Sequence, residues 1–232
     1  GPELAAELRK QNIKVRGVSR RPFPGDWEHR QADVTNLAEV LDVVDGSSVV
    51  YLLVGLEYDI RVWRRDWPVV IENVIQACLN NNAKLVFLDN VYAYGLVNGP
   101  MAENSPIRPN SEKGKVRARL VQLLFNAAQN NHLRVCIARA ADFYGPQCRT
   151  SVLNSTLFER FAKGSSAFVM GRADKIHTYT YTRDIGPALA MLGTDDRADG
   201  QVWHLPTSAE RWTGEDWVKA AAEVFGVKPK FR

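Results

Sequence analysis

Before residue 140, apolar residues recur in two patterns that take turns along the chain. Spacings of i, i+3 and i+4 predict amphipathic helices. Alternating apolar residues and short unbroken apolar runs predict strands, and the unbroken runs are typical of strands buried on both faces of a parallel sheet. The helical pattern covers 2–11, 37–44, 66–79 and 111–130, and the strand pattern covers 13–18, 49–54, 84–88 and 133–138. No hairpin signal interrupts this order, so the sequence predicts a doubly wound α/β fold with helices on both faces of a parallel sheet.

The rhythm of the pattern changes after Tyr144-Gly145-Pro146. Helical spacing there covers 153–163, 183–192 and 213–225, and short strand-like pieces cover 167–169, 176–181 and 202–205. We therefore expect a larger α/β domain over 1–146 and a smaller mixed α/β region over 147–232, with the chain weaving between the two.

Composition narrows the class of protein. The 232 residues are 45% hydrophobic and 24% charged, which excludes a disordered, collagen-like or disulfide-scaffold chain. Thirty Lys+Arg against 26 Asp+Glu leave a net charge of +4, too small an excess to indicate a nucleic acid or a membrane surface as partner. The longest strongly apolar run, Val49 to Val54, is far shorter than the roughly 20 residues that cross a bilayer.

Cysteines and histidines are few and scattered. The cysteines are Cys78, Cys136 and Cys148, and the histidines are His29, His132, His177 and His204. An odd number of cysteines without CxxC spacing indicates neither a disulfide framework nor a zinc site. We expect a cytoplasmic protein without a metal site, in which Cys78 and Cys136 are small core residues.

Candidate ligand-binding segments follow the predicted strands, because open α/β sheets bind ligands beyond the carboxyl ends of their strands. These segments are 19–21, 33–34, 53–56, 88–94 and 139–145. The sequence contains no GxxxxGK[ST] phosphate loop, GxSxG elbow or HExxH pair, so the commonest non-redox enzyme classes lose support.

Seven segments match one ordered set of motifs. They are Gly1-Pro-Glu-Leu (the last glycine of GxxGxxG), Asp33-Val34, Val50–Val54 (VxHLAA), Val86–Gly95 (VxxSSxxVYG), Glu103–Pro109 (ExxPxxP), Arg139–Pro146 (RxxxxYGP) and Lys175–Asp184 (a substrate-domain signal). Together these segments extend over essentially the whole chain. With them the chain resembles the extended short-chain dehydrogenases/reductases, the NAD(P)-dependent epimerase/dehydratase group.

The resemblance implies a Rossmann-like dinucleotide-binding domain over 1–146 and a substrate-binding region over 147–232. It also implies that the first strand and two further glycines precede Gly1 and that the substrate region continues, so we expect a longer chain. Family members commonly dimerise through two helices that match 66–79 and 111–130, so we expect a homodimer. The implied cofactor-binding residues are Gly1, Ser19, Arg20, Arg21, Asp33, Val34, Leu53, Val54, Gly55, Leu88, Asp89, Arg117, Ala141 and Phe143.

The catalytic positions depart from the family pattern. In that family a Ser or Thr orients the substrate, a Tyr transfers the proton, and a Lys four residues later supports the Tyr and binds the nicotinamide ribose. The matching positions carry Asn90, Lys113 and Arg117. Asn90 keeps a donor for a carbonyl, and Arg117 keeps donors for ribose hydroxyls but cannot release its proton. An exposed basic helix face explains Lys113 and Arg117 equally well.

A replacement for the missing Tyr is therefore needed if the protein is an enzyme. Lys113 serves as a proton shuttle only with a strongly lowered pKa. Tyr92 and Asp89 are the other candidates, and Asp142 flanks the same expected position. Each candidate also has a structural explanation. Tyr92 is explained as a packing aromatic, and Asp89 and Asp142 are explained as residues that cap strand ends.

Ser19-Arg20-Arg21 follows the predicted strand 13–18 and bears on cofactor choice. The segment lacks the acidic residue that binds the ribose 2′-hydroxyl of NAD, and an Arg there suits the 2′-phosphate of NADP. We expect NADP, with NAD as the alternative; a solvated basic loop explains the same residues. Asp33 is either an adenine contact or a helix-start cap.

Two functions follow from these residues. The first is an NAD(P)-dependent oxidoreductase or epimerase-like enzyme for a small carbonyl, hydroxy or sugar-nucleotide substrate. The second is a catalytically inactive NAD(P)-binding regulator or sensor, which the replacement of all three catalytic positions favours.

Overall fold

The computed structural model describes residues 1–22, 25, 27–146, 148 and 150–231, and it divides the chain into two compact units. Unit 1 comprises Gly1–Arg139 and Gly186–His204, and unit 2 comprises Ala140–Ile185 and Leu205–Arg232. The chain first leaves unit 1 after Arg139, a few residues before the expected boundary at 146, and later returns to it. Residues 147 and 149, beside that boundary, lie outside the described residues.

The sheet at the centre of unit 1 has the strand order β3-β4-β5-β8, with parallel β3/β4 and β5/β8 ladders. Every residue of β5 is buried, as expected for a strand covered on both faces. The strands are β3 (Val49–Leu52), β4 (Lys84–Asn90), β5 (Val135–Ala140), whose last residue already belongs to unit 2, and β8 (Val202–His204). The predicted α/β fold is thus confirmed.

A separate two-stranded parallel sheet joins β1 (Arg16–Ser19) and β2 (Glu28–Gln31). The strand predicted from residue 13 begins only at Arg16, and β2 was not predicted. Its sequence, Glu-His-Arg-Gln, has no apolar alternation because none of its residues is fully buried.

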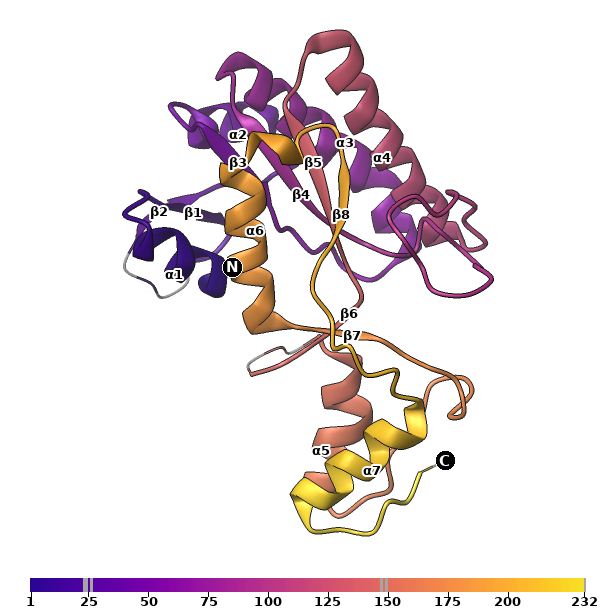
Figure 1. Ribbon diagram of the computed structural model, residues 1–232. Helices are drawn as coiled ribbons and strands as arrows, with labels where there is room; N and C mark the ends of the chain where they lie inside the picture. Colours follow the sequence, from indigo (N-terminus) through magenta and orange to yellow (C-terminus); the bar gives the residue numbers. More distant parts are fainter. Residues whose placement is uncertain (23–24, 26, 147, 149, 232) are drawn as a thin grey trace. The chain divides into compact units, whose positions relative to one another are not determined.

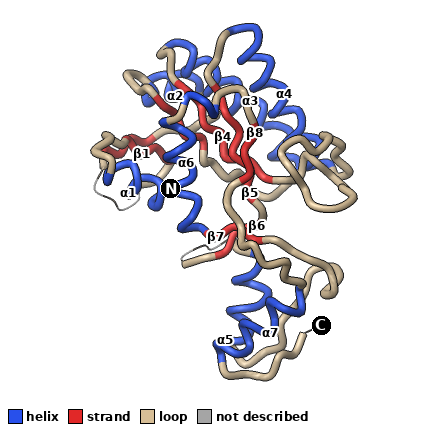
Figure 2. The backbone as a smooth tube through the Cα atoms, viewed as in Figure 1, coloured by secondary structure: helices blue, strands red, loops and turns tan. Residues whose placement is uncertain are grey.

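Helices cover both faces of the four-stranded sheet (Figures 1 and 2). The helices α2, α3 and α4 share one apolar core with β3, β4 and β5. Residues 186–194 of α6 lie on the other face, where Gly193 leaves room for the ring of Tyr51 on β3: a Cβ there would lie 1.9 Å from the Tyr51 hydroxyl oxygen. The helices of unit 1 are α1 (Pro2–Lys10), α2 (Leu37–Val44), α3 (Ile60–Asn80), α4 (Glu112–Asn131), most of α6 (Thr182–Thr194) and a 3-10 turn (Asp196–Ala198).

Helix α3 begins six residues earlier than its predicted start at 66. Asp59 caps it, because its carboxylate accepts a hydrogen bond from the Arg61 backbone N–H at 2.7 Å. Trp63 and Trp67 then continue the buried face toward the amino end, four residues apart. The N-cap of α2 is Asn36, whose side-chain oxygen accepts from the backbone N–H groups of Ala38 and Glu39.

Unit 2 has a core of its own between α7 (Gly214–Phe225) and the helical segment that contains Asn154–Phe158 and α5 (Glu159–Ala162). Thr213 and Asp216 form a capping box at the start of α7, as the Thr-x-x-Asp spacing suggests. Two short strands, β6 (Asp142–Tyr144) and β7 (Tyr179–Tyr181), pair in parallel. The predicted strand 167–169 is reduced to one bridge between Ala167 and Phe231, and β6 is too short for a periodic signal. None of the helices in the described ranges is long and apolar enough to cross a bilayer.

Candidate active site

The end of β1 presents positive charge. Arg20 and Arg21 are exposed there. The Ser19 hydroxyl contacts the Arg21 carbonyl and lies 3.0 Å from Nε2 of His29 on β2, which fixes the turn. Exposed guanidinium groups on a fixed turn suit a phosphate group.

The turn after β2 has its own internal contacts. The Asp33 carboxylate accepts hydrogen bonds from the Thr35 N–H at 2.9 Å and the Thr35 hydroxyl at 2.7 Å, and these bonds lower the pKa of Asp33. The Val34 carbonyl accepts from the Asn73 amide at 3.1 Å. Asp33 therefore orders the start of α2, and its contact with adenine stays a prediction.

Glycines leave open space at two positions where a cofactor backbone is expected. A Cβ on Gly1 or on Gly55 would have no atom within 4 Å. Gly1 is also the N-cap of α1 and has no side chain to cap the first turn, so the first-turn N–H groups suit an anion such as a pyrophosphate. Leu53, Val54 and Leu88 are partly buried beside these strand ends. The donor chemistry of this edge fits a dinucleotide.

Asp89, at the carboxyl end of β4, holds two arginines in the interior. Its Oδ1 lies 2.6 Å from Nε of Arg117, and its Oδ2 lies 3.2 Å from Nε of Arg139. All three side chains are at most 4% exposed. The Arg117 guanidinium also lies 4.5 Å from the ring of Trp67. This geometry favours a positioning role for Arg117 and Asp89, and ribose binding by Arg117 stays a prediction.

Arg139 continues the cluster toward β8. Its guanidinium carbon lies 4.3 Å from the ring centre of Tyr94, whose hydroxyl lies 2.7 Å from Nε2 of His204. Burial lowers the pKa of His204, Glu103 opposes the shift, and Arg139 reinforces it. Tyr94 is fully buried, so its ring packs in the interior of unit 1.

Two phenols and an ammonium group meet near the end of β4. The Tyr92 hydroxyl lies 3.3 Å from the Tyr58 hydroxyl. The Lys113 amine donates to the Tyr58 carbonyl at 3.0 Å and lies 3.1 Å from the centre of the Tyr58 ring. Asn90 is next to this group, because its side-chain oxygen accepts from the Tyr92 N–H at 3.0 Å. Asn90, Tyr92 and Lys113, proposed from the sequence, are thus brought together.

Sequence reasoning missed several members of this site. Tyr58 lies on the loop before α3 and carried no motif. The four-residue spacing of Trp63 and Trp67 is a helical signal that could have extended α3 toward the site. Arg139 opens the RxxxxYGP segment, yet its pairing with Asp89 depends on tertiary structure.

The remaining candidates, Ala141 and Phe143, belong to unit 2. The Ala141 N–H donates to the Thr180 hydroxyl at 3.0 Å, and Phe143 lies in β6. Asp142 lies 3.0 Å from Nε2 of His177. Asp89 and Asp142 are both expected from the sequence beside the nicotinamide position. Asp89 belongs to unit 1 and pairs with arginines, whereas Asp142 belongs to unit 2 and contacts His177.

Two cysteines lie in the core, as the sequence predicts. Cys78 and Cys136 are fully buried, and burial raises their pKa values to about 12 and about 11. The described residues contain no group of three His, Cys, Asp or Glu side chains that could hold a metal ion.

The fold of this chain is similar to that of several solved structures. The alignment with the solved structure of MoeE5 in complex with UDP-glucose and NAD covers 98% of this chain and 79% of the MoeE5 chain. Its TM-score is 0.83, and the sequences are 22% identical. UDP-glucose 4-epimerase from Thermotoga maritima matches 100% of this chain and 82% of its own, with a TM-score of 0.86 and 16% identity. At these identities the likeness shows the fold.

Two curated relatives are similar in sequence. "Short-chain dehydrogenase/reductase family 42E member 1" of Xenopus laevis is 31% identical over 74% of this chain and 50% of its own length. "3beta-hydroxysteroid-dehydrogenase/decarboxylase isoform 2" of Arabidopsis thaliana is 25% identical over 71% of this chain and 30% of its own length. The chain thus spans half or less of these relatives. Residues 1–205 match the profile of the NAD dependent epimerase/dehydratase family, so the chain belongs to that family.

Proposed function

We propose that the protein is an NAD(P)-dependent oxidoreductase or epimerase-like enzyme for a small carbonyl, hydroxy or sugar-nucleotide substrate. The observation that carries this proposal is the group of Tyr58, Tyr92 and Lys113 beside Asn90. It contains a phenol and an ammonium group, the same kinds of group that the family's missing Tyr and Lys would supply.

The proposed chemistry divides between cofactor and protein. A bound nicotinamide supplies hydride transfer, and the protein orients the substrate and moves a proton. The amide group of Asn90 donates a hydrogen bond to the substrate oxygen. The Tyr92 hydroxyl gives that oxygen its proton and is resupplied through the Tyr58 hydroxyl, while the charge of Lys113 lies over the Tyr58 ring.

Cofactor and substrate are assigned to different elements. The exposed Arg20 and Arg21 favour NADP over NAD through the 2′-phosphate, with Gly1 at the pyrophosphate. Unit 2 would supply the substrate-binding residues. The family resemblance supports a homodimer that forms through α3 and α4. The cysteine usage supports a cytoplasmic location.

A second candidate is an NAD(P)-binding regulator without turnover. The burial of Arg117 against Asp89 favours it, because the guanidinium is already engaged inside the protein. The Lys113 amine likewise already has an acceptor in the Tyr58 carbonyl.

Steady-state oxidation of NADPH across a panel of carbonyl compounds tests the enzyme proposal. We expect turnover on at least one compound, and Tyr92→Phe should lower kcat by roughly 10²-fold or more, because it removes the proton donor. Tyr51→Phe, which removes a phenol packed against Gly193 of α6, is the matched control. Tight NADPH binding without turnover on any compound would establish the regulator instead.

A further inference from the structure

Unit 2 contains a cavity of about 270 Å³ with aromatic walls, near the small end of the range for small-molecule sites. The rings stand nearly perpendicular to the ring of Trp217: Tyr144 at 68°, Tyr179 at 81° and Trp212 at 70°, with centroids 4.8–5.4 Å away. Edge-to-face packing of this kind holds the rings that line the cavity in fixed orientations. We call this space the aromatic cavity.

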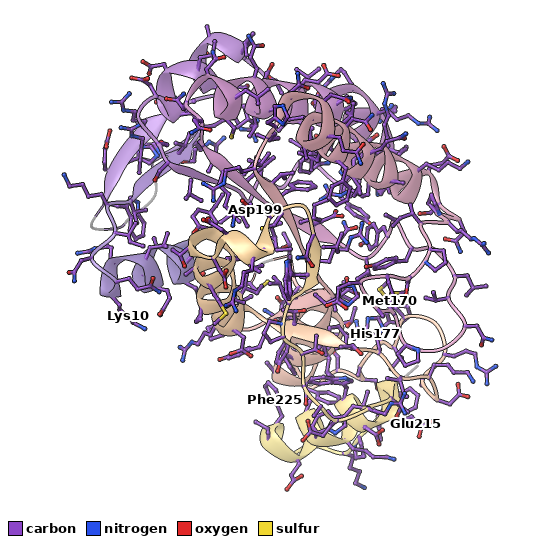
Figure 3. The ribbon with its side chains drawn as sticks, turned by 45° about the horizontal axis from the view of Figure 1, so that its top comes forward. Lys10, Met170, His177, Asp199, Glu215 and Phe225 are labelled. Atoms are coloured by element: carbon purple, nitrogen blue, oxygen red, sulfur yellow. The ribbon has the colours of Figure 1, made fainter. Side chains whose placement is uncertain are left out.

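The polar lining of the aromatic cavity includes one carboxylate. Glu210 supplies a carboxylate, and the Ser208 hydroxyl contacts that carboxylate. His177 (Figure 3) also lines the cavity, and its Nε2 lies 3.0 Å from the Asp142 carboxylate, which holds the ring in place. Among the described residues that line this cavity there is no Lys or Arg.

A neighbouring cavity of about 160 Å³ shares His177, Tyr179 and Trp217 but differs in charge. It includes Arg172 and Lys175, and Arg172 donates to both oxygens of Asp174 at 2.9 and 2.6 Å. Two basic side chains thus line the neighbouring cavity, whereas the described lining of the aromatic cavity has a carboxylate and no Lys or Arg.

We propose that the aromatic cavity binds an organic cation, the ammonium group of a small ligand. Ring faces attract a cation through their quadrupoles, and the Glu210 carboxylate adds an opposite charge. An anionic ligand such as a diphosphate would meet the Glu210 carboxylate instead. Calling the ligand a substrate rests on the proposed function, whereas binding itself does not.

Binding of cyclohexylammonium and of cyclohexanol, which have similar size and different charge, tests the proposal on the full chain. Isothermal titration and tryptophan fluorescence measure both. We expect the ammonium compound to bind at least about fivefold more tightly, since one cation–π contact contributes about 0.5–1 kcal/mol and several rings line the cavity. Glu210→Gln should reduce that preference by about two- to fivefold. Glu223→Gln, an exposed carboxylate on α7 outside both cavities, is the matched control.

The inference would be overturned by equal binding of the two compounds or by a preference that Glu210→Gln leaves unchanged. It would also be overturned by tighter binding of UDP, an anionic probe, that weakens with Trp212→Leu. NADPH titration of the same samples keeps the two proposals apart. Cofactor binding without ammonium binding rejects the inference alone, and ammonium binding without cofactor binding rejects the proposed function alone.

Discussion

At the scale of single residues, Asp89 shows how this chain differs from its family pattern. The sequence shows that Asn90, Lys113 and Arg117 replace the Ser/Thr, Tyr and Lys of the family pattern. It does not show that Asp89 forms an ion pair with Arg117. That pairing brings together residues 28 positions apart, and Arg139 joins from 50 positions away. An ion cluster of this kind has no local signal, so sequence reasoning could not have found it.

Asp89→Asn should destabilise the fold strongly. The substitution leaves two buried guanidinium groups without a counter-charge, which costs about 3–5 kcal/mol of unfolding free energy. Urea denaturation measures the loss, and Asp174→Asn, an exposed partner of Arg172, should leave the midpoint unchanged. A stable Asp89→Asn protein would show that the cluster contributes little.

His204 should make stability depend on pH. Burial lowers its folded-state pKa below the ordinary 6.5, so the unfolded chain binds a proton more readily than the folded one. The stability present above pH 6.5 is therefore lost as the pH falls through and below that value. The unfolding free energy should change less between about pH 7.5 and pH 5.5 in His204→Gln than in the original protein. If it changes by the same amount in both proteins, His204 is not the source of the pH dependence.

At the scale of elements, the first turn of α4 depends on Gly114. A Cβ at this position would lie 2.5 Å from the Tyr92 carbonyl oxygen, so the glycine lets α4 approach the end of β4. This contact places Lys113 near Tyr58. From the sequence alone, the glycine in Lys-Gly-Lys-Val-Arg is only a residue of low helix propensity inside a helix.

Gly114→Ala should cost about 1–3 kcal/mol through overpacking, despite the better helix propensity of alanine. It should also lower any turnover that depends on Lys113 and Tyr92. Arg119→Ala, at an exposed position of the same helix, is the control and should leave both properties near their original values. If Gly114→Ala were as stable as the control, the close approach would not be required.

At the scale of the whole molecule, periodicity predicted most of the architecture, because the buried strands and amphipathic helices carry strong local signals. β2, with its polar sequence, and the early start of α3 escaped detection. The short pairing of β6 with β7 also carries too few residues for a pattern. Local signals thus established the fold class, while the contacts of Tyr58, Asp89 and Arg139 depended on residues distant in sequence.

We propose that unit 1 binds a nicotinamide dinucleotide and selects NADP through the arginines after β1. Isothermal titration with NADPH and NADH tests it most directly. We predict saturable binding of both, with NADPH tighter by about tenfold or more, and a loss of that preference in Arg20→Asp, because a charged hydrogen bond to phosphate contributes about 1.5–3 kcal/mol. Failure of both dinucleotides to bind would contradict the account, and an unchanged preference in Arg20→Asp would contradict its choice of NADP.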